Sequence, residues 1–423
     1  MGKNKTLKDY EQQIRECVKC GACQAHCPTY LENRREGSVA RGKIALAAAL
    51  LDKTGDLEKR LRQDISMCLM CGSCVDKCPN KVPTDQIVGA IRREITENRG
   101  LSLLGRGVST VIGNKSLMKA AIKTGAVLSP LMLKEVPASS GLRLRFPTPV
   151  MKDRSLPKIP AENLFDLFPE FIQGDTNKPV VGFFAGCSIS FIYPEIGASM
   201  IRLLQKMGYS VFLPRSQKCC GIPALSSGDG RLVEKLAEQN IKSFQEHDVQ
   251  HIITCCASCN GGIKEYYSSM KDDNADFTGK VIDFNIFLAE QGFIDEIAEL
   301  PKWQNRKKVT YHDPCHLKTQ GIVKEPRALL RALPNVEFVE MDGASSCCGL
   351  GGTFSVYHYE TSKAIGARKI AGLEASGAEM IATACPGCIM QLQDVVNHAG
   401  LKVKAVHILD LIAESVGITL PPE

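Results

Sequence analysis

Hydrophobic and polar positions follow a regular rhythm through the second half of the chain, where short apolar runs alternate with amphipathic runs. The apolar runs, typical of buried strands, cover residues 180–184, 209–213 and 251–254, and the amphipathic runs, typical of helices, cover 196–207 and 231–246. The rhythm returns with apolar runs at 308–312, 336–341 and 380–383 and amphipathic runs at 327–333 and 360–376. Strands alternating with helices predict a small α/β unit with a largely parallel sheet, present twice.

The first half of the chain has a different pattern. Residues 1–98 are predicted to be helical, most strongly at 41–51 (RGKIALAAALL). Residues 99–177 begin with a basic, partly amphipathic helical segment and continue into a stretch that contains Pro147, Pro149, Pro157 and Pro160. Such a proline-rich stretch indicates an extended connector. We therefore expect four parts: residues 1–98, 99–177, 178–305 and 306–423.

Composition favours an ordinary globular protein. Of 423 residues, 44% are hydrophobic and 23% are charged. The sequence has no run of about 18 apolar residues that could span a bilayer, and no secretory signal precedes Cys17. The 19 cysteines are therefore expected in a reducing cytoplasm, with at most a peripheral contact at the inner face of the cell membrane.

The net charge of +6 is concentrated in one segment. Eight basic residues face a single acid, Glu135, between residues 99 and 145; they are Arg99, Arg106, Lys115, Lys119, Lys123, Lys134, Arg143 and Arg145. The segment is either a solvated helix face or a docking surface for an acidic partner or anionic headgroups. Nucleic acid is disfavoured, because aromatic residues do not interleave the charges.

Eight cysteines form two runs of the pattern C-x2-C-x2-C-x3-C-P. These are Cys17, Cys20, Cys23 and Cys27, and Cys68, Cys71, Cys74 and Cys78. In such runs three thiolates bind one 4Fe-4S cubane and the fourth, before proline, binds the other. We therefore expect Cys17, Cys20, Cys23 and Cys78 to hold one cubane, and Cys68, Cys71, Cys74 and Cys27 to hold the second. Zinc is the alternative metal. With every iron held by cysteine, this part would relay electrons and perform no chemistry of its own.

Ten further cysteines fall into two copies of another pattern: a lone Cys, then Cys-Cys-Gly, then Cys-x-x-Cys. The first copy is Cys187, Cys219, Cys220, Cys256 and Cys259; the second is Cys315, Cys347, Cys348, Cys385 and Cys388. The lone Cys and the Cys-x-x-Cys each follow a predicted strand, so the thiols should meet at the carboxyl edge of each parallel sheet. A glycine after each Cys-Cys pair indicates positive φ or a close approach to a bulky group.

These motifs identify family resemblances. The 40 residues between Cys27 and Cys68 make the first part similar to the helical ferredoxin domain of succinate dehydrogenase-type subunits. The repeated units resemble the cysteine-rich CCG domain. The whole chain resembles the iron–sulfur subunit of glycolate oxidase and D-lactate dehydrogenase complexes, the electron-carrier subunit of anaerobic glycerol-3-phosphate dehydrogenase and the catalytic subunit of heterodisulfide reductase. The resemblance implies an α+β multidomain protein, with a helical two-cluster ferredoxin domain followed by two small α/β CCG domains.

The resemblance also implies a function. In heterodisulfide reductase, complete CCG motifs hold noncubane 4Fe-4S clusters, so each five-cysteine set would hold one; a single such cluster, zinc or no metal are the alternatives. The expected role is electron transfer from a partner FAD subunit, which oxidises D-lactate or glycolate, to a quinone, cytochrome or other carrier. The alternatives are reduction of a disulfide at a noncubane cluster, or a role like that of the electron carrier of anaerobic glycerol-3-phosphate dehydrogenase. No flavin or nicotinamide site is visible, and Gly349–Gly352 is not read as a dinucleotide loop.

Several residues beside the cysteines are candidates for a role. His312, Asp313 and His316 surround Cys315. The two histidines could donate protons, or these residues could bond to cluster sulfur or cap the next helix. Cys255 has no counterpart in the second copy, where Ala384 stands, so it is either a buried free thiol or an alternative ligand.

Overall fold

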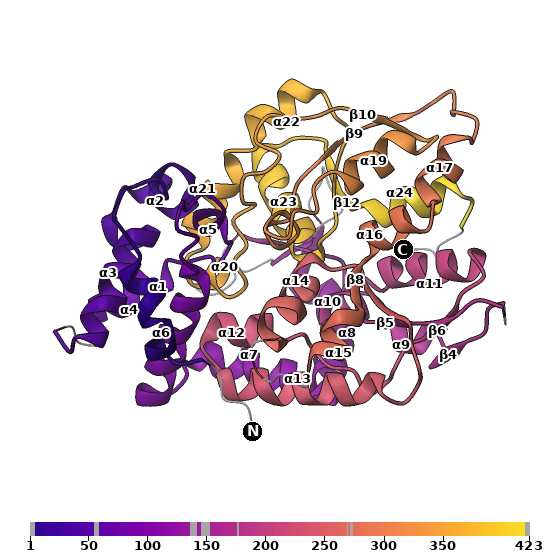
Figure 1. The fold of residues 1–423 in the computed structure, drawn as a ribbon. Helices are drawn as coiled ribbons and strands as arrows, with labels where there is room; N and C mark the ends of the chain where they lie inside the picture. The colour runs from indigo at the N-terminus through magenta and orange to yellow at the C-terminus, as the bar shows by residue number, and fades with distance from the viewer. Residues whose placement is uncertain are drawn as a thin grey trace.

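The first copy of the repeated unit is a five-stranded sheet flanked by helices (Figure 1). The structure is a computed structural model that describes residues 5–54, 59–135, 142–144, 153–175, 177–268, 270 and 274–418. The strands are β4 (Phe171–Ile172), β5 (Val180–Phe183), β6 (Ser210–Phe212), β7 (His251–Thr254) and β8 (Val281–Asp283). The helices are α10 (Gly186–Phe191), α11 (Pro194–Lys206), α12 (Ile222–Ser227), α13 (Gly230–Phe244), α14 (Ala257–Gly261), the π-helix η4 (Gly262–Tyr267), α15 (Ala275–Lys280), α16 (Phe284–Glu290) and α17 (Phe293–Ala298).

The second copy has four strands: β9 (Lys307–Tyr311), β10 (Val336–Phe338), β11 (Met380–Thr383) and β12 (Lys404–His407). Its helices are α18 (Cys315–Lys318), α19 (Glu325–Ala332), α20 (Phe354–Tyr357), α21 (Tyr359–Ala367), α22 (Ile370–Ser376), α23 (Pro386–Ala399) and α24 (Ile408–Ser415). The strand order β10-β9-β11-β12 reproduces β6-β5-β7-β8, and all these pairs are parallel. Strand β4 adds an antiparallel edge to the first sheet. The predicted duplication of a parallel α/β unit is confirmed.

Central strands are buried on both faces, as continuous apolar runs predict. In β5 and β7 the side chains of Val181, Phe183, Ile252 and Ile253 are at most 1% exposed. Helices from the two copies pack against each other in equivalent pairs. Helix α11 contacts α24 as α19 contacts α16, and α14 contacts α18 as α23 contacts α10. The copies therefore form a pseudo-symmetric pair.

The N-terminal part is a helical domain, drawn in indigo at the left of Figure 1. It contains η1 (Leu7–Tyr10), α1 (Glu11–Arg15), η2 (Gln24–His26), α2 (Pro28–Asn33), η3 (Glu36–Ser38), α3 (Ala40–Leu51), α4 (Lys59–Ser66), α5 (Ser73–Asp76) and α6 (Thr84–Arg99). Helix α6 buries Ile87, Val88 and Ile91, which recur at helical spacing. The strong helix signal at 41–51 becomes α3, so the predicted helical character is confirmed.

The helical domain is docked on both copies. Arg92 of α6 donates a hydrogen bond to the Ser226 carbonyl of the first copy at 3.1 Å. Ser66 lies 2.9 Å from Nε2 of His358 in the second copy. These contacts fix the domain where the two copies meet.

Residues 100–170 connect the parts. They form α7 (Leu103–Gly113), α8 (Lys115–Met132), the short antiparallel strands β1 (Leu133–Glu135), β2 (Leu142–Leu144) and β3 (Ser155–Leu156), and α9 (Leu164–Leu167). Helix α7 packs on α12 and α13 of the first copy, whereas the Ser155 amide donates to Asp394 of the second copy at 2.7 Å. The segment therefore straps the two copies together. Arg145, Pro147 and Pro149 lie outside the described residues.

Two cations of the basic segment bind within the chain. Lys119 pairs with Asp166 at 2.6 Å, and the ammonium of Lys115 lies 3.3 Å from the centroid of the Phe165 ring. Burial lowers the pKa of Lys115 to about 8. Lys115 and Lys119 are therefore engaged within the chain. Neither is available to the docking surface that the basic segment could form.

The structure differs from the sequence prediction in three places. Residues 171–172, expected to belong to the connector, form β4 at the edge of the first sheet. The single helical run predicted at 360–376 is two helices, α21 and α22, because Lys369 between them turns inward and donates to the Gly343 carbonyl at 2.6 Å. Strands β8 and β12 were not predicted, because three or four residues between helices give little periodic signal.

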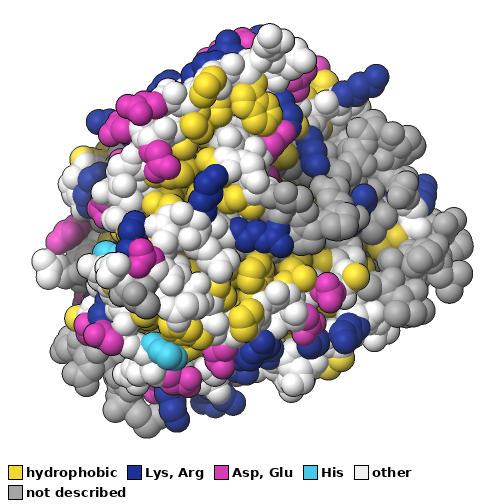
Figure 2. All heavy atoms as spheres, turned by 90° about the vertical axis from the view of Figure 1, so that its right-hand side faces the viewer, with side chains coloured by type: hydrophobic (Ala, Val, Ile, Leu, Met, Phe, Trp, Pro, Cys, Tyr) yellow, Lys and Arg dark blue, Asp and Glu magenta, His cyan; other side chains and the backbone are white. Residues whose placement is uncertain are grey.

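Figure 2 shows the face turned away from the helical domain, where Lys and Arg side chains are interspersed with Asp and Glu. Charge on this face is therefore of mixed sign. Among the described helices, none combines the length and the apolar character that crossing a bilayer requires.

Candidate functional site

The two ferredoxin runs line two neighbouring cavities in the helical domain. One cavity is lined by Cys17, Cys20, Cys23 and Cys78, with Cys74 at its border. The other is lined by Cys27, Cys68, Cys71 and Cys74. Each cavity thus brings together three cysteines of one run and the last cysteine of the other. Because Cys74 borders both cavities, the two groups of thiols are adjacent.

The loops around these cavities share one backbone conformation. Lys19 and Gly21 have φ of +55° and +86°, and Met70 and Gly72, at the matching positions of the second run, have φ of +55° and +67°. Left-handed residues that alternate with right-handed ones turn successive N–H groups toward a common centre, which suits an anion. The Met70 amide lies 3.4 Å from the Cys68 sulfur. The loops are therefore shaped for a negatively charged group.

Two buried cations stand beside the second cavity. Lys43, 1% exposed, lines it and donates to the Gly37 carbonyl at 3.1 Å. Burial lowers the pKa of Lys43, and the thiolates of Cys68 and Cys27 oppose this. Arg92 donates to the Cys68 carbonyl at 2.7 Å. A buried cation needs an opposite charge, which a cluster held by four thiolates would supply.

The first five-cysteine site lies at the carboxyl edge of the first sheet. Its thiols come from three segments: α10 after β5 (Cys187), the loop between β6 and α12 (Cys219, Cys220), and the start of α14 after β7 (Cys256, Cys259). The sulfurs of Cys187 and Cys219 are 3.4 Å apart. Asn240 donates to the Cys219 carbonyl and Tyr267 to the Cys220 carbonyl, both at 3.0 Å. These bonds fix the Cys-Cys loop.

The second five-cysteine site repeats this arrangement. Cys315 begins α18 after β9, Cys347 and Cys348 lie in the loop after β10, and Cys385 and Cys388 lie at the start of α23 after β11. The sulfurs of Cys348 and Cys388 are 3.6 Å apart. All five residues are buried. The predicted position of both sets, at the carboxyl ends of parallel strands, is confirmed.

The glycines after the Cys-Cys pairs have positive φ, as expected. Gly221 has φ of +94° and Gly349 has φ of +96°. A Cβ on Gly349 would overlap the Ser362 carbonyl oxygen. A Cβ on Gly186, beside Cys187, would lie 2.8 Å from the Cys259 sulfur. A side chain at Gly186 would therefore intrude on the thiol group, and one at Gly349 would collide with α21.

The electrostatics of both sites favour thiolates at some positions. Hydrogen bonding from Cys219 holds the pKa of Cys220 well below its usual value, and Cys347 does the same for Cys348. Contact with Cys256 lowers the pKa of Cys385. Thiolate, not thiol, is the form that binds metal.

The cysteine groups touch one another. Cys71 of the helical domain contacts Cys315 and Cys347 of the second site, and the hydrogen bond that the Cys71 thiol donates to Cys315 raises the pKa of Cys71 to about 12. Cys385 of the second site contacts Cys256 of the first site. The four groups therefore form one series: the first cavity, the second cavity, the second five-cysteine site and the first five-cysteine site.

The candidate residues around Cys315 separate in space. His312 is fully buried beside Cys348 and Cys388. Burial lowers the pKa of His312. His316 is half-buried and packs over Gly261 of the first copy, where a Cβ would lie 2.9 Å from that of His316. The carboxylate of Asp313 binds both terminal nitrogens of Arg327, at 2.7 and 2.9 Å, which anchors this loop.

Cys255 is fully buried, and burial raises its pKa well above the usual value. Its carbonyl oxygen accepts a hydrogen bond from Nε2 of His407 at 3.0 Å.

The donor sets fit iron–sulfur clusters. All 19 cysteines are free thiols, and 18 of them fall into the four groups described above. Two groups offer the four thiolates that a cubane needs, and the other two offer five, one more than a tetrahedral zinc site takes. Buried Lys43 supplies the compensating charge beside one of them.

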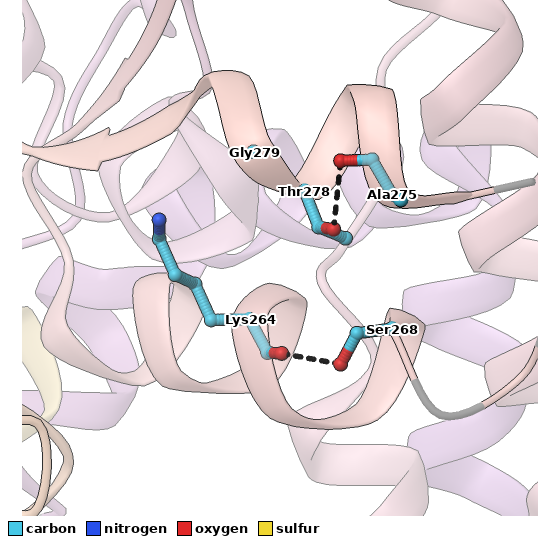
Figure 3. A pocket seen from close by; sticks show the side chains of 5 residues that line it. All are labelled: Lys264, Ser268, Ala275, Thr278 and Gly279. Carbon is cyan, nitrogen blue, oxygen red and sulfur yellow. Dashed lines mark hydrogen bonds between the residues drawn. The ribbon is translucent and has the colours of Figure 1, made fainter. Parts of the chain in front are cut away.

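Another hollow has no cysteine among its described lining residues (Figure 3). It is lined by Lys264, Ser268, Ala275, Thr278 and Gly279. The Ser268 hydroxyl donates to the Lys264 carbonyl at 2.6 Å, and the Thr278 hydroxyl to the Ala275 carbonyl at 3.3 Å. Both hydroxyls are therefore engaged within their own helices.

Comparison with known proteins agrees with this arrangement. Residues 13–82 match the model of a 4Fe-4S dicluster domain, and residues 181–264 and 309–393 each match the cysteine-rich domain, CCG. The probable glycolate oxidase iron-sulfur subunit of Bacillus subtilis (strain 168) is 32% identical, over 96% of this chain and 95% of its own length. The chain belongs to this family of iron–sulfur subunits.

Other members of the family are more distant. A subunit of the dihydromethanophenazine:CoB–CoM heterodisulfide reductase of Methanosarcina barkeri (strain Fusaro / DSM 804) is 25% identical over 96% of this chain and 95% of its own length. Lactate utilization protein A of Oceanobacillus iheyensis is 29% identical over 55% of this chain and 96% of its own length. The relatives include subunits of oxidoreductases, and this chain is an iron–sulfur electron-transfer protein.

Sequence reasoning missed the cations that serve these sites. Lys43, Arg92 and Lys369 are buried beside cysteine groups, yet each lies in a helical stretch where a charged residue predicts a solvated face. Arg327, which anchors Asp313, is also distant from the motif in sequence. The absence of acids at helical spacing around Lys43 was a weak signal that it is not part of a surface ion pair.

Proposed function

We propose that this chain is the iron–sulfur subunit of a flavin-dependent 2-hydroxy-acid dehydrogenase complex. A partner FAD subunit oxidises D-lactate or glycolate, and this chain carries the electrons to a quinone, cytochrome or other carrier. The full-length similarity to the probable glycolate oxidase iron-sulfur subunit supports the choice of complex. Delivery to a quinone would bring the protein to the inner face of the cell membrane.

The cofactors in this proposal are held by the four cysteine groups. Cys17, Cys20, Cys23 and Cys78 hold one cubane, Cys68, Cys71, Cys74 and Cys27 hold the second, and each five-cysteine set holds a further, noncubane 4Fe-4S cluster. Bound clusters of this kind accept and release single electrons. The observation that carries the proposal is the unbroken series of thiol groups, joined through Cys74, through Cys71 and Cys315, and through Cys385 and Cys256.

One end of the series reaches the surface. Cys20 is exposed, and Val18 beside it is 70% exposed. At the other end of the series, four cysteines of the first five-cysteine site are buried and Cys187 is only partly exposed. The loop at residues 18–20 is therefore the place in this proposal where electrons pass to or from a partner protein.

The proposal is tested by reconstitution. The purified, iron-loaded chain should oxidise neither D-lactate nor glycolate by itself. Mixed with its FAD-linked partner, it should be reduced when either substrate is added, and absorbance near 400 nm should bleach. Activity of the chain alone, or no reduction with the partner present, overturns the proposal. Glycerol 3-phosphate, offered with its own dehydrogenase, tests the nearest alternative donor.

A second candidate is reduction of a disulfide at the paired five-cysteine sites. Cys256 of one site contacts Cys385 of the other, so the two sites face each other, and relatives at 23–25% identity are named as subunits of a heterodisulfide reductase. Electron paramagnetic resonance of an oxidised sample treated with thiols tests this function. A new signal that depends on the thiol supports it, and unchanged spectra over a panel of thiols exclude it.

A further inference from the structure

We propose that Nε2 of His312 binds iron at the second five-cysteine site. The histidine would then be a sixth protein ligand, with no counterpart in the first copy. This inference rests on the proposed function to the extent that the second set must hold an iron cluster.

His312 lies close to two of the proposed cysteine ligands. His312 follows β9 directly, and its imidazole lies with Cys348 and Cys388 in a buried group whose ligand atoms are all within 4.8 Å of one another. Two sulfurs and one imidazole nitrogen at this separation can reach a common metal centre. Among the described residues, a search for three or more histidine, cysteine or acidic side chains whose ligand atoms lie this close together finds His312, Cys348 and Cys388.

The hydrogen bond of its other ring nitrogen fixes the tautomer of His312. Nδ1 of His312 lies 3.2 Å from the Ala344 carbonyl oxygen. A carbonyl can only accept, so the proton is on Nδ1 and the lone pair is on Nε2. The same carbonyl also accepts from Lys369 at 3.1 Å and from the Asp313 amide at 3.1 Å, which holds it in place. A ligating histidine in a metal site is usually oriented in this way, by a bond from its other nitrogen to a carbonyl.

The remaining ring nitrogen of His312, Nε2, is the atom available to a metal. Nε2 of His312 is buried and receives no well-aligned hydrogen bond from a described residue, and His312 is 0% exposed. The side chain that His312 contacts on this side is Cys348, which is itself a proposed ligand. A buried acceptor without a partner is destabilising. Once Cys348 binds iron as a thiolate it has no proton to donate, and coordination to iron then gives the lone pair of His312 a partner.

The first copy offers an internal comparison. Phe184 stands there at the position that His312 occupies in the second copy, with the same distance to the lone cysteine. Phe184 is also 0% exposed. The same pocket thus holds a side chain without a ligand atom in one copy and an oriented imidazole in the other, so the two five-cysteine sites differ in ligand set.

Pulsed electron paramagnetic resonance of the iron-loaded chain labelled with 15N-histidine tests the proposal. Samples are prepared at a series of potentials, because each cluster is paramagnetic in only one of its redox states. We expect a strong nitrogen coupling, of the size shown by nitrogen bonded to iron, and its loss in H312F. The matched control H316N, four residues along and half-buried, should keep the coupling. A weak coupling alone, or a strong one that survives in H312F, overturns the proposal.

Two further measurements separate the possible failures. The double variant C347A/C348A should lose the coupling together with part of the iron; if its iron content and spectra equal those of the unchanged chain, the second set holds no cluster and the proposed cofactor set fails. If H312F does not fold, H312Q, with a neutral side chain of similar reach, replaces it. In either case, the spectrum of the labelled wild-type chain shows whether a histidine nitrogen is bonded to iron.

Discussion

The thiol of Cys71, in the helical domain, contacts the thiol of Cys315, at the start of α18 in the second copy. Both are cysteines of the motifs, so candidate ligands form part of the interface between the helical domain and the second copy. Leu69, Phe354 and Ile365 pack around this contact as a small hydrophobic cluster of their own. The docking of the helical domain therefore sets the distance between two cofactor sites.

Substitution G72A should weaken this docking. A Cβ on Gly72, at φ of +67°, would lie 2.5 Å from the Thr319 methyl carbon. Left-handed backbone costs a non-glycine residue roughly 1–2 kcal/mol, and the overlap adds to it. We expect a lower Tm of the loaded protein and faster proteolysis between the helical domain and the first copy.

The double variant G72A/T319S is the control, because serine lacks the methyl group that overlaps. It should recover the part of the loss that comes from the overlap, and only the backbone cost should remain. Equal Tm values for the single and double variants would show that Thr319 does not limit this interface.

The ferredoxin runs also predict which cysteines exchange between clusters. C78A should remove the cubane held with Cys17, whereas C27A should remove the one held with Cys68. Iron content should fall by about four atoms in each variant, and a different low-temperature resonance signal should vanish in each. If both variants lost the same signal, the exchange of ligands between runs would be refuted.

The exposed loop predicts where a partner docks. We expect V18D to reduce the rate of electron exchange with the FAD subunit about tenfold, which corresponds to about 1.4 kcal/mol, while the midpoint potentials stay unchanged. L103D is the matched control, because Leu103 is an apolar residue that is 87% exposed on α7. Equal effects of V18D and L103D on stopped-flow reduction would speak against a partner at residues 18–20.

Motif spacing predicted the architecture and the positions of the cysteines because both depend on local sequence. The strand runs at 251–254 and 380–383 match β7 and β11 residue by residue, and the cysteines follow them directly. Contacts between the groups, such as Cys256 with Cys385, depend on how the copies pack, which no local pattern encodes. The helix predicted at 360–376 failed for a related reason, since the inward turn of Lys369 is fixed by carbonyls from a distant loop.

Lys369 should raise the reduction potential of the second five-cysteine site. It is 1% exposed and donates to the Gly343 and Ala344 carbonyls at 2.6 and 3.1 Å. Burial lowers the pKa of Lys369 to about 8, while the thiolate of Cys348 opposes this. K369M removes a buried positive charge beside the site, so we expect a fall of about 50–120 mV, equal to about 1–3 kcal/mol for one electron.

A redox titration followed by resonance signals measures this shift. K43M is the matched variant, because Lys43 is equally buried but lies beside the second cubane cavity. Each variant should move the potential of its own site more than that of the other. A uniform shift of all signals would point to a change in global structure and not to a local charge.

Acid should destabilise the protein through His407. Its Nδ1 accepts from the Leu409 amide at 3.2 Å, and its Nε2 lies 3.0 Å from the Cys255 carbonyl oxygen, so the neutral ring caps α24 and joins the two copies. Burial lowers the pKa of His407 to about 4, against about 6.5 in the unfolded chain. The unfolded state therefore binds a proton first, and stability should be lost as the pH falls from about 6.5 to about 4, by about 3 kcal/mol at most.

Thermal unfolding of the metal-free chain between pH 7 and pH 4 measures this effect without acid damage to clusters. H407Q keeps an amide nitrogen near the position of Nε2 but cannot be protonated. It should be less stable than the wild type at pH 7, because the cap on α24 is lost, and should show a smaller fall in Tm toward pH 4. Parallel pH profiles for the two proteins would mean that His407 is not the group that couples acid to unfolding. Buried Asp283 cannot explain a loss of stability in acid, because burial raises its pKa to about 7 and its protonation therefore stabilises the folded state as the pH falls.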